Sequence, residues 1–398
     1  NSQAEEEDEN EIDLEDDKEA TADDNEIDLD QEETSIDADT QDTTALPLVA
    51  QLLILGTGCA APSPYRGALG QVILGHDHVL DIPWAIALDA GEGFVTQWLR
   101  HGSGSISRIS VIWISHAHWD HYGGLVPLLL AIAADQQSDE STKYQNGHSV
   151  EEPSAKRPRP QTSNVPLVLA PRKVLRFLEA MWPTNLKSGQ EIVYYHGVAL
   201  EDHGSKHYTA WEDWNATFSS RQVIFWENVV VDHSCRSSYG CVFGLQRPGS
   251  LSPRPDTAKP FVMAFSGDTR PCRQLVQACR HFSRPVHDCY EACPGRLPPP
   301  ALPELDFLIH EATFDENERE MSLRKKHSTI REAMDIGHHV RARRTLLTHF
   351  SQRYNRHDED SHMPTIPSTI LQQNAKNGTH HMRVGMAFDG MLIPLYDE

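Results

Sequence analysis

Apolar runs of strand length recur along the chain from residue 48 onward, each bounded by glycine, proline or polar residues. The first run, residues 48–55, has the pattern of a buried strand and stops at Gly56. Similar runs predict further strands at residues 71–74, 85–89, 109–114, 166–169, 223–232, 241–245, 261–265, 307–310, 345–348 and 384–387. Segments of helical length and composition lie between them, at residues 94–100, 125–134, 172–181 and 330–339.

The order of these predicted elements indicates the fold class. Runs of strands alternate with helices in two similar halves of the chain. Because each sheet must bury an apolar face, this pattern is expected to give two sheets packed face to face with helices outside. We therefore predict an α/β (α+β) fold with one large domain over residues 45–398, since 39% apolar residues suffice for a sizeable core.

Residues 1–44 differ from the rest of the chain in charge and composition. They contain 21 of the 58 acidic residues, one basic residue, Lys18, and no aromatic residue. The net charge of −23 is therefore mostly theirs, because the remaining residues carry 37 acidic and 34 basic side chains. So little apolar area cannot offset the entropy lost on ordering, and we predict a disordered acidic tail or linker. A partial repeat at residues 10–14 and 25–29 leaves docking on a basic partner as an alternative.

Two later segments also lack the period of a packed element. Residues 135–164 are polar and predict a disordered surface insertion, in which the basic run 154–160 is a solvated loop or a nuclear-import signal. Residues 289–303 are rich in proline and predict a loop. For Cys289 and Cys293 we expect free thiols rather than a third zinc site with His287, because no second ligand pair stands at zinc-finger spacing.

Cysteine usage and hydropathy bear on the compartment. Seven cysteines with no paired framework and no secretory segment favour an intracellular, reducing environment. No apolar stretch approaches the ~18 residues needed to span a bilayer, so we expect no membrane partner. The first residue is Asn1 rather than methionine, and we expect the chain to be a fragment whose upstream part is absent.

A cluster of metal-ligand side chains stands directly after the predicted strand at residues 109–114. Its members are His116, His118, Asp120 and His121. Side chains two positions apart in an extended loop point the same way, so His116 and His118 can reach one ion. Asp120 and His121 follow where the chain turns toward a helix, and would face a second ion. Imidazole and carboxylate suit zinc, with manganese or iron as alternatives.

The cluster has too few ligands to complete two four-coordinate sites. Three further candidates each follow a predicted strand: His233, Asp268 and His349. Loops at strand ends are where active-site residues converge. With the cluster they supply the seven ligands that a two-metal site with a bridging carboxylate needs, and Asp268 is the natural bridge.

The cluster and its downstream ligands resemble the metallo-β-lactamase superfamily, whose fold is an αββα sandwich that usually holds two metals. Other segments resemble the signatures of one family in it, tRNase Z: His-Glu-Ala-Thr at 310–313, His-Ser-Thr at 327–329 and His-Phe-Ser-Gln-Arg-Tyr at 349–354. Residues 56–58, 88–92, 266–272 and 387–389 fit the same family in order. The resemblance covers residues 50–396 apart from the insertions, and is closest to the carboxy-terminal catalytic half of the long form.

The resemblance implies a function as well as a fold. It implies an endoribonuclease that removes the 3′ trailer of precursor tRNA with two zinc ions per chain, or manganese in their place. Metal-activated hydroxide would attack the phosphodiester, leaving a tRNA 3′-OH and a trailer 5′-phosphate. An amino-terminal half that grips the tRNA would be a partner missing from this chain, and the location would be the nucleus, the mitochondrion or the cytoplasm.

The resemblance also implies a role for each site residue. One ion would be held by His116, His118 and His233, the other by Asp120, His121 and His349, with Asp268 between them. Asp120 would orient the attacking hydroxide. Glu311 paired with His327 would protonate the leaving oxygen, since a carboxylate beside an imidazole favours its charged form. The residues expected to contact substrate are Arg66, Ser328, Thr329 and Arg353.

A protein surface that binds an RNA backbone needs positive charge. The sequence contains three short basic runs, at residues 172–173, 324–326 and 341–344. Only the run 324–326 adjoins an expected catalytic residue, so it is the preferred phosphate contact. Two other functions stay open. One is a phosphodiesterase or thioesterase of the same fold acting on another ester, and the other is a noncatalytic tRNA-binding scaffold.

Overall fold

The computed structural model describes most of the chain beyond residue 49. The described residues are 50–60, 63–77, 82–102, 104–145, 165–182, 194–201, 223–247, 260–283, 305–355 and 382–396. They all fall within one compact unit, Pro47–Glu398. The predicted tail at residues 1–44, the rest of the predicted insertion at 146–164 and the predicted loop at 289–303 lie outside the described residues and stay predictions.

The first of two sheets has the strand order β13-β1-β2-β3-β4-β5-β6. Its strands are β1 (Gln51–Gly56), β2 (Gly70–Asp77), β3 (Ile82–Leu88), β4 (Ile109–Trp113), β5 (Leu167–Ala170), β6 (His196–Ala199) and β13 (Leu392–Pro394). The pairs β13–β1, β1–β2 and β2–β3 are antiparallel, and the pairs from β3 to β6 are parallel. The last strand of the chain therefore returns to lie beside the first.

The second sheet has the order β12-β11-β10-β9-β8-β7. Its strands are β7 (Val223–Val230), β8 (Tyr239–Leu245), β9 (Phe261–Phe265), β10 (Leu305–Glu311), β11 (Ala342–Thr348) and β12 (Arg383–Met386). The pairs β7–β8 and β8–β9 are antiparallel, and the pairs from β9 to β12 are parallel. Each sheet thus joins an antiparallel part to a parallel part, as two similar halves predict.

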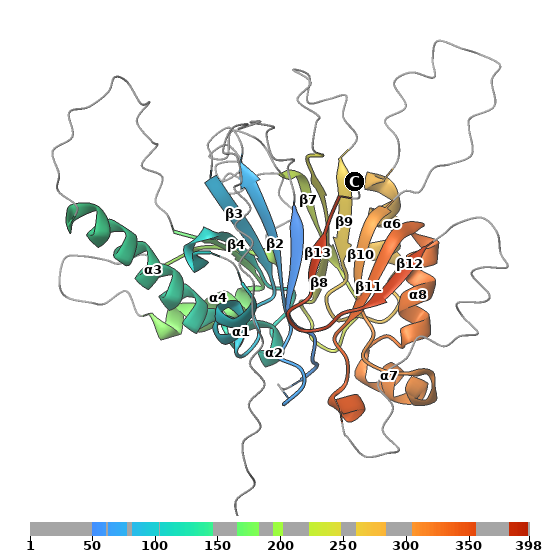
Figure 1. Cartoon of the computed structure of the whole chain (residues 1–398). Helices are drawn as coiled ribbons and strands as arrows, with labels where there is room; N and C mark the ends of the chain where they lie inside the picture. Colours follow the sequence, from blue (N-terminus) through green and yellow to red (C-terminus); the bar gives the residue numbers. More distant parts are fainter. Residues whose placement is uncertain are drawn as a thin grey trace, which may run out of the picture. The chain divides into compact units, whose positions relative to one another are not determined.

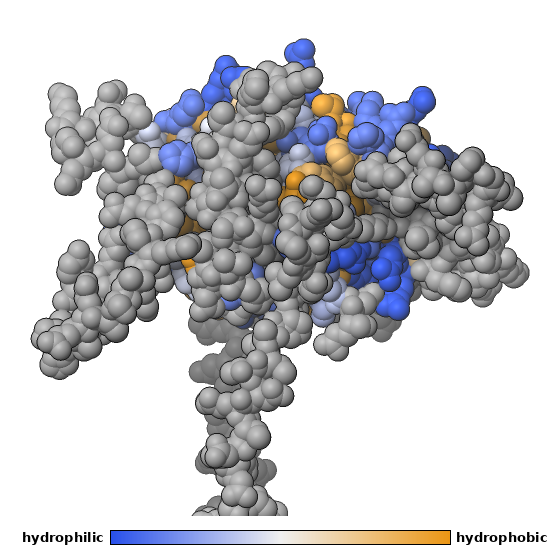
Figure 2. Space-filling model, turned by 90° about the horizontal axis from the view of Figure 1, so that it is seen from above, coloured by the Kyte–Doolittle hydropathy of each residue, from blue (hydrophilic) through white to orange (hydrophobic). Residues whose placement is uncertain are grey.

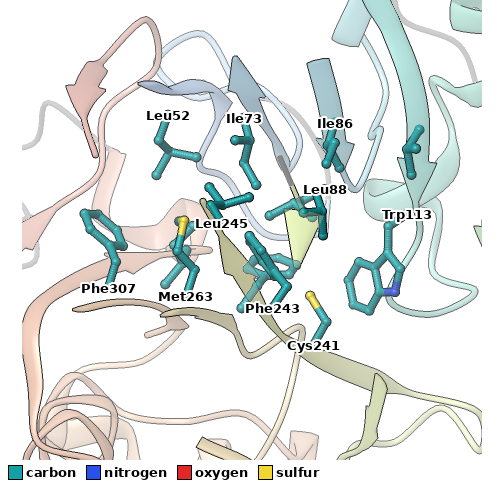
Figure 3. Packing of buried hydrophobic residues seen from close by; sticks show 14 of the residues in the cluster. Leu52, Ile73, Ile86, Leu88, Trp113, Cys241, Phe243, Leu245, Met263 and Phe307 are labelled. Carbon is teal, nitrogen blue, oxygen red and sulfur yellow. The ribbon is translucent and has the colours of Figure 1, made fainter. Parts of the chain in front are cut away.

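The main core lies between the sheets, which face each other (Figures 1 and 3). Alternate residues of each strand enter it because strand side chains point to opposite faces in turn. The first sheet contributes Leu52, Ile73, Ile86, Leu88 and Trp113, and the second contributes Cys241, Phe243, Leu245, Met263 and Phe307. Burying one such large side chain contributes about 1.5–3 kcal/mol, so this layer is the main source of stability.

Helices cover the outer faces of both sheets (Figure 1). The first sheet is covered by α1 (Phe94–His101), α3 (Leu125–Gln145) and α4 (Arg172–Met181), which pack on the residues that alternate with the central core. The second sheet is covered by α6 (Arg273–Phe282) and α8 (Ile330–His339). Two short helices, α2 (Trp119–Tyr122) and α7 (Arg319–Lys325), lie at one end of the strands. The described residues form the αββα sandwich that the sequence predicted.

The predicted helix ending at residue 134 was too short, because α3 continues to Gln145. Residues 135–138 are partly buried or exposed, so this part of α3 does not require an apolar period. The sequence analysis also missed β6, β13, α6 and α7. β6 and β13 are short edge strands, and α7 buries only Ser322, so none of the three has a strong apolar period.

The outer surface is mixed in polarity. Seen from the top of Figure 1, blue polar areas surround smaller orange apolar areas over the described residues (Figure 2). None of the helices that the structure describes has the length and apolar character needed to cross a bilayer.

Candidate metal centre

Strand direction brings the predicted ligands together at one end of the sandwich. β7, β9, β10 and β11 run the same way, so their carboxyl ends lie at one edge of the second sheet. His233, Asp268 and His349 follow three of these strands, and Glu311 ends the fourth. The loop after β4 adds the predicted cluster from the first sheet. All seven predicted ligands occur in three overlapping groups of potential metal-binding atoms.

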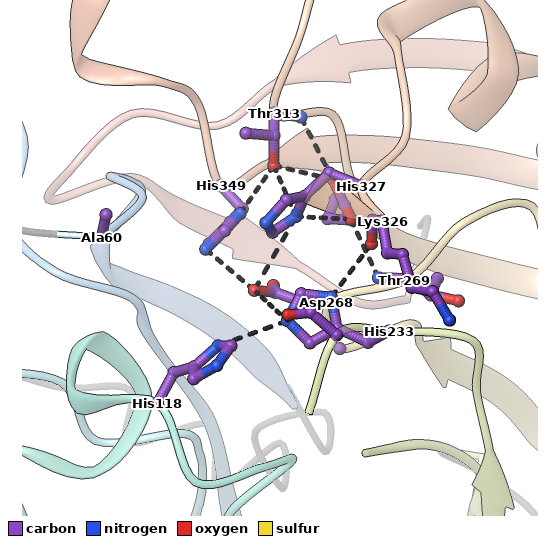
Figure 4. A network of polar contacts seen from close by, with 12 residues as sticks. Ala60, His118, His233, Asp268, Thr269, Thr313, Lys326, His327 and His349 are labelled. Carbon is purple, nitrogen blue, oxygen red and sulfur yellow. Dashed lines mark hydrogen bonds and ion pairs between the residues drawn. The ribbon is translucent and has the colours of Figure 1, made fainter. Parts of the chain in front are cut away.

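The first group contains three histidines and one carboxylate. Its members are His116, His118, His233 and Asp268, whose potential ligand atoms all lie within 4.8 Å of one another. His118 Nδ1 lies 2.8 Å from His116 Nε2 and 3.2 Å from His233 Nε2. Asp268 Oδ2 lies 3.6 Å from His116 Nε2 and 3.9 Å from His233 Nε2 (Figure 4). The arrangement matches the ligand set predicted for the first ion.

The second group contains Asp120, His121 and His349, and it shares Asp268 with the first group. Asp268 Oδ2 lies 3.2 Å from His121 Nε2 and 3.4 Å from His349 Nε2. Asp120 Oδ2 lies 3.6 Å and 3.3 Å from the same two nitrogens. One oxygen of Asp268 therefore faces both groups, which is the position that a bridging carboxylate requires.

Partners behind the imidazoles set which nitrogen faces the centre. His233 Nδ1 donates to the Lys326 carbonyl at 3.0 Å, and His121 Nδ1 donates to Asp89 Oδ2 at 2.8 Å. His349 Nδ1 lies 2.8 Å from the Thr313 hydroxyl. With Nδ1 engaged in each ring, the Nε2 lone pair is the one available to a metal.

Electrostatics act differently on the imidazoles of the two groups. Burial and the neighbouring imidazoles lower the pKa of His116 well below its ordinary value, and burial and His233 lower the pKa of His118 to about 4. Burial alone would lower the pKa of His121 and His349, but the Asp268 and Asp120 carboxylates raise both pKa values well above the ordinary value, so these rings lose a proton when an ion binds. Burial alone would raise the pKa of Asp268, but His121 and His349 lower it well below its usual range. Neutral imidazoles and ionised carboxylates are the forms that bind metal.

Spacing and unpaired atoms test whether a metal fits. Atoms bound to one tetrahedral zinc ion at about 2.1 Å lie roughly 3.4 Å apart. The separations are 3.2–3.6 Å in the second group and 2.8–3.9 Å in the first, on either side of this value. Among the described residues, His121 Nε2 and Asp268 Oδ1 are buried without a hydrogen-bond partner of good geometry. A buried polar atom without a partner is costly, and a cation would satisfy both. The residues fit a two-metal centre.

The predicted acid pair lies beside this centre. Glu311 is buried, and its Oε1 lies 3.0 Å from His327 Nδ1. Burial alone would raise the pKa of Glu311, but the His327 imidazole holds it below the usual range. The carboxylate also accepts hydrogen bonds from the Thr269 amide at 2.9 Å and the Thr313 hydroxyl at 2.7 Å. The His327 side chain is 12% exposed, so its ring reaches the rim of the site.

Sequence reasoning assigned no role to two residues that connect the centre. Asp89 directly follows β3, and its carboxylate accepts hydrogen bonds from His121 Nδ1, from the Ser115 amide at 2.7 Å and from the Ser115 hydroxyl at 2.8 Å. The Thr313 hydroxyl donates to Glu311 and lies close to Nδ1 of both His327 and His349 (Figure 4). Both residues stand in segments that carried the family resemblance, so the signal for them was present but was not used.

Arg270 holds the segment that carries His327. Its Nη1 donates to the His327 carbonyl at 2.6 Å, to Ser322 Oγ at 2.9 Å and to Glu332 Oε2 at 2.7 Å. Its Nη2 donates to the other carboxylate oxygen of Glu332. Such a two-pronged contact is specific to a guanidinium, and here it ties α7, α8 and the loop after β9 together.

Replacing Arg270 by methionine is expected to lower the free energy of unfolding by on the order of 3 kcal/mol, because Glu332 would keep a largely buried charge without its partner. Urea unfolding followed by fluorescence measures this. The double variant Arg270→Met, Glu332→Gln is the matched control, because glutamine removes the charge and can keep the bond to the Thr329 amide in the capping box, and it should recover most of the loss. A single variant as stable as the parent chain would contradict the role assigned to Arg270.

The structure places three of the four predicted substrate contacts in structural roles. Ser328 is buried and donates to the Thr269 carbonyl at 2.7 Å. Thr329 caps α8, with its hydroxyl accepting from the Glu332 amide in a capping box. Arg66 is 4% exposed, donates to Thr57 Oγ1 at 2.7 Å and stacks on the Phe350 ring at 4.7 Å. Their polar groups face protein rather than solvent, which does not favour substrate contact.

Arg353 and the basic run 324–326 do reach the surface. Arg353 is 48% exposed and pairs with Glu318. Arg324 and Lys325 are exposed at the end of α7, and Lys326 Nζ donates to Asp232 Oδ1 at 2.9 Å. The run 341–344 lies at the start of β11, whereas His349 follows its end, so that run is at the opposite end of the sheet.

The sequence is similar to one family model and to individual known proteins. The model of the metallo-β-lactamase superfamily matches residues 89–180. A ribonuclease Z of Myxococcus xanthus is 29% identical, over 87% of this chain and 97% of that protein. A mitochondrial tRNase Z of Arabidopsis thaliana is 26% identical, over 87% of this chain and 35% of that protein. The chain therefore spans nearly all of the bacterial relative and about a third of the plant one.

Comparison with solved structures supports the same fold. A long-form RNase Z from yeast matches 87% of this chain and 42% of its own, with TM-score 0.57 and 21% identity. The short form of human tRNase Z matches 87% of this chain and all of its own, with TM-score 0.51 and 21% identity. The chain has the metallo-β-lactamase fold and resembles ribonuclease Z over most of its length.

Proposed function

Because the chain has the metallo-β-lactamase fold and resembles ribonuclease Z, we propose that it is a metal-dependent endoribonuclease that removes the 3′ trailer of precursor tRNA. The observation that carries the proposal is the Glu311–His327 pair, joined at 3.0 Å beside the metal centre. A metal centre alone suits many hydrolases of this fold. A positioned imidazole at the rim adds a proton donor, which an alkoxide leaving group such as the 3′ oxygen of RNA needs.

The metal content follows from the donor set. We propose two zinc ions, the first held by His116, His118 and His233, the second by Asp120, His121 and His349, with Asp268 shared. Histidine and carboxylate ligands suit zinc, and manganese is the alternative. When bound, the ions would activate a water molecule and neutralise charge on the phosphoryl oxygens.

The chain's own residues then have three tasks. Asp120 would orient the attacking water, and its Oδ2 is positioned by the Ala60 amide at 2.6 Å. His327 would donate a proton to the departing 3′ oxygen, with Glu311 holding its Nδ1 so that Nε2 faces the substrate. The products would be a tRNA with a 3′-OH and a trailer with a 5′-phosphate.

RNA binding would draw on surface charge near the site. Arg353 is half-exposed, and Arg324 and Lys325 lie on the surface next to His327. These side chains could contact phosphates, whose attraction to basic residues dominates RNA affinity. The plant relative is nearly three times as long as the part this chain matches, so we propose that a further tRNA-gripping half acts as a partner. That relative is named mitochondrial, which supports a mitochondrial location over a nuclear or cytoplasmic one.

Substrate comparison tests the proposal against other hydrolases of this fold. A precursor tRNA with a short 3′ trailer should be cut at one site by the purified chain, while the same tRNA without a trailer should not. Cyclic nucleotides and a thioester serve as the competing substrates. Preferential hydrolysis of either one would favour the alternative enzymes, and no hydrolysis of any substrate would favour a noncatalytic scaffold.

A further inference from the structure

One potential metal ligand at the centre belongs to neither predicted ligand set. Cys59 Sγ, an Asp120 carboxylate oxygen and a His349 ring nitrogen all lie within 4.8 Å of one another. Cys59 is partly exposed, whereas Asp120 and His349 are buried. The thiol therefore lies at the open side of the second metal group.

Backbone contacts hold Cys59 in this position. The Cys59 amide donates to the Phe350 carbonyl at 3.1 Å, and the Phe350 amide donates to the Thr57 carbonyl at 2.8 Å. The segment after β1 therefore runs beside the segment after β11, so that Cys59 lies across from His349. The next residue, Ala60, has a positive φ of 68° and donates its amide to Asp120 Oδ2 at 2.6 Å. Two neighbouring residues thus contact two different ligands of the same ion.

Unpaired atoms at the same place point to a cation. His121 Nε2 is fully buried and lies 3.2 Å from Asp268 Oδ2 and 3.6 Å from Asp120 Oδ2, but among the described residues it has no hydrogen-bond partner of good geometry. Asp268 Oδ1 is also buried without such a partner. A cation held by the nearby carboxylates, imidazoles and thiol would satisfy both atoms.

We propose that Cys59 Sγ is a direct ligand of the second metal ion, together with Asp120, His121 and His349. The sulfur–metal bond forms as the thiol proton passes to solvent. Thiolate is a soft ligand that favours zinc, cobalt or cadmium over manganese and magnesium. Cys59 would thus make the second position selective for the softer ions. The inference rests on the metal centre proposed above and not on the RNA substrate.

Cobalt substitution tests this proposal without an activity assay. A thiolate bound to Co²⁺ gives an intense near-ultraviolet charge-transfer band, whereas nitrogen and oxygen ligands give only weak visible bands. The purified chain loaded with Co²⁺ should show the charge-transfer band. Cys59→Ser and Cys59→Ala should lose it and keep the visible bands. The matched control is Cys235→Ser, a partly exposed thiol two residues from His233, which should keep the band.

The possible outcomes distinguish the role of Cys59 as a ligand from the existence of the metal centre. Visible bands without a charge-transfer band in the parent chain would overturn the role of Cys59 and leave the two-metal centre standing. A band that persists in both Cys59 variants would also overturn it. No cobalt bound at all would overturn the metal centre and, with it, the proposed function.

Discussion

The variant Asp268→Asn should lose most of its activity and at least one of its metal ions. Asp268 Oδ2 lies 3.2–3.9 Å from nitrogens of both metal groups, so its negative charge acts on both positions. Metal contacts to a phosphoryl group supply several kcal/mol of transition-state stabilisation. Since about 1.4 kcal/mol corresponds to a tenfold change, the rate of trailer removal should fall on the order of 10³-fold. Elemental analysis and single-turnover cleavage measure the two effects.

A second buried carboxylate provides the control for Asp268. Asp306 lies near the start of β10, at the opposite end of the strand from Glu311. It is 3% exposed and accepts hydrogen bonds from the Val262 amide at 2.9 Å and from Arg247 at 2.6 Å. Asp306→Asn should lower stability while leaving the metal content and the rate per folded molecule unchanged. If Asp268→Asn retained the full metal content and rate, Asp268 would not be the bridge.

Replacing His327 by alanine should slow cleavage about 10²–10⁴-fold without loss of metal, the range expected when a general acid is removed. Its Nδ1 is bound to Glu311, so only its other nitrogen can serve the substrate. Single-turnover cleavage measures the rate, and elemental analysis measures the metal content.

The control for His327 is a surface histidine in the helix that follows it, α8. His339, at the end of α8, has its Nδ1 at 2.7 Å from the Asp335 carbonyl and lies on the surface. His339→Ala should leave the rate and the metal content unchanged. A His327→Ala variant that cleaves at the parent rate would remove His327 from the mechanism, while leaving the metal centre intact.

The fold was predictable because the buried strands are nearly continuous apolar runs. Both faces of each sheet are covered, so strands such as β9 need no polar side chain and are easily recognised. Elements with little buried surface carried no such signal, and β6, β13 and α7 were missed. The predicted ligands were brought together because the strands they follow, from both sheets, end at the same end of the sandwich.

The motifs did not reveal which protein groups the side chains of the predicted substrate contacts touch. Ser328 donates to the Thr269 carbonyl, 59 residues away, and Arg66 donates to the Ala387 carbonyl, 321 residues away. Neither contact has a local pattern in the sequence. Thr329 is different, because Thr-x-x-Glu at residues 329–332 is the capping-box pattern and could have been recognised. The long-range contact of Cys59 with Asp120 and His349 was likewise invisible.

Metal-dependent cleavage of precursor tRNA is the most direct test of the account. The purified chain is incubated with an end-labelled, 3′-extended precursor tRNA, with chelator, without it, and with zinc restored after chelation, and the cut is mapped. The account predicts one cut at the start of the trailer, a 3′-OH on the tRNA and a 5′-phosphate on the trailer, lost with chelator and regained with zinc. Cleavage that is indifferent to chelator, or products ending in a 3′-phosphate, would contradict it.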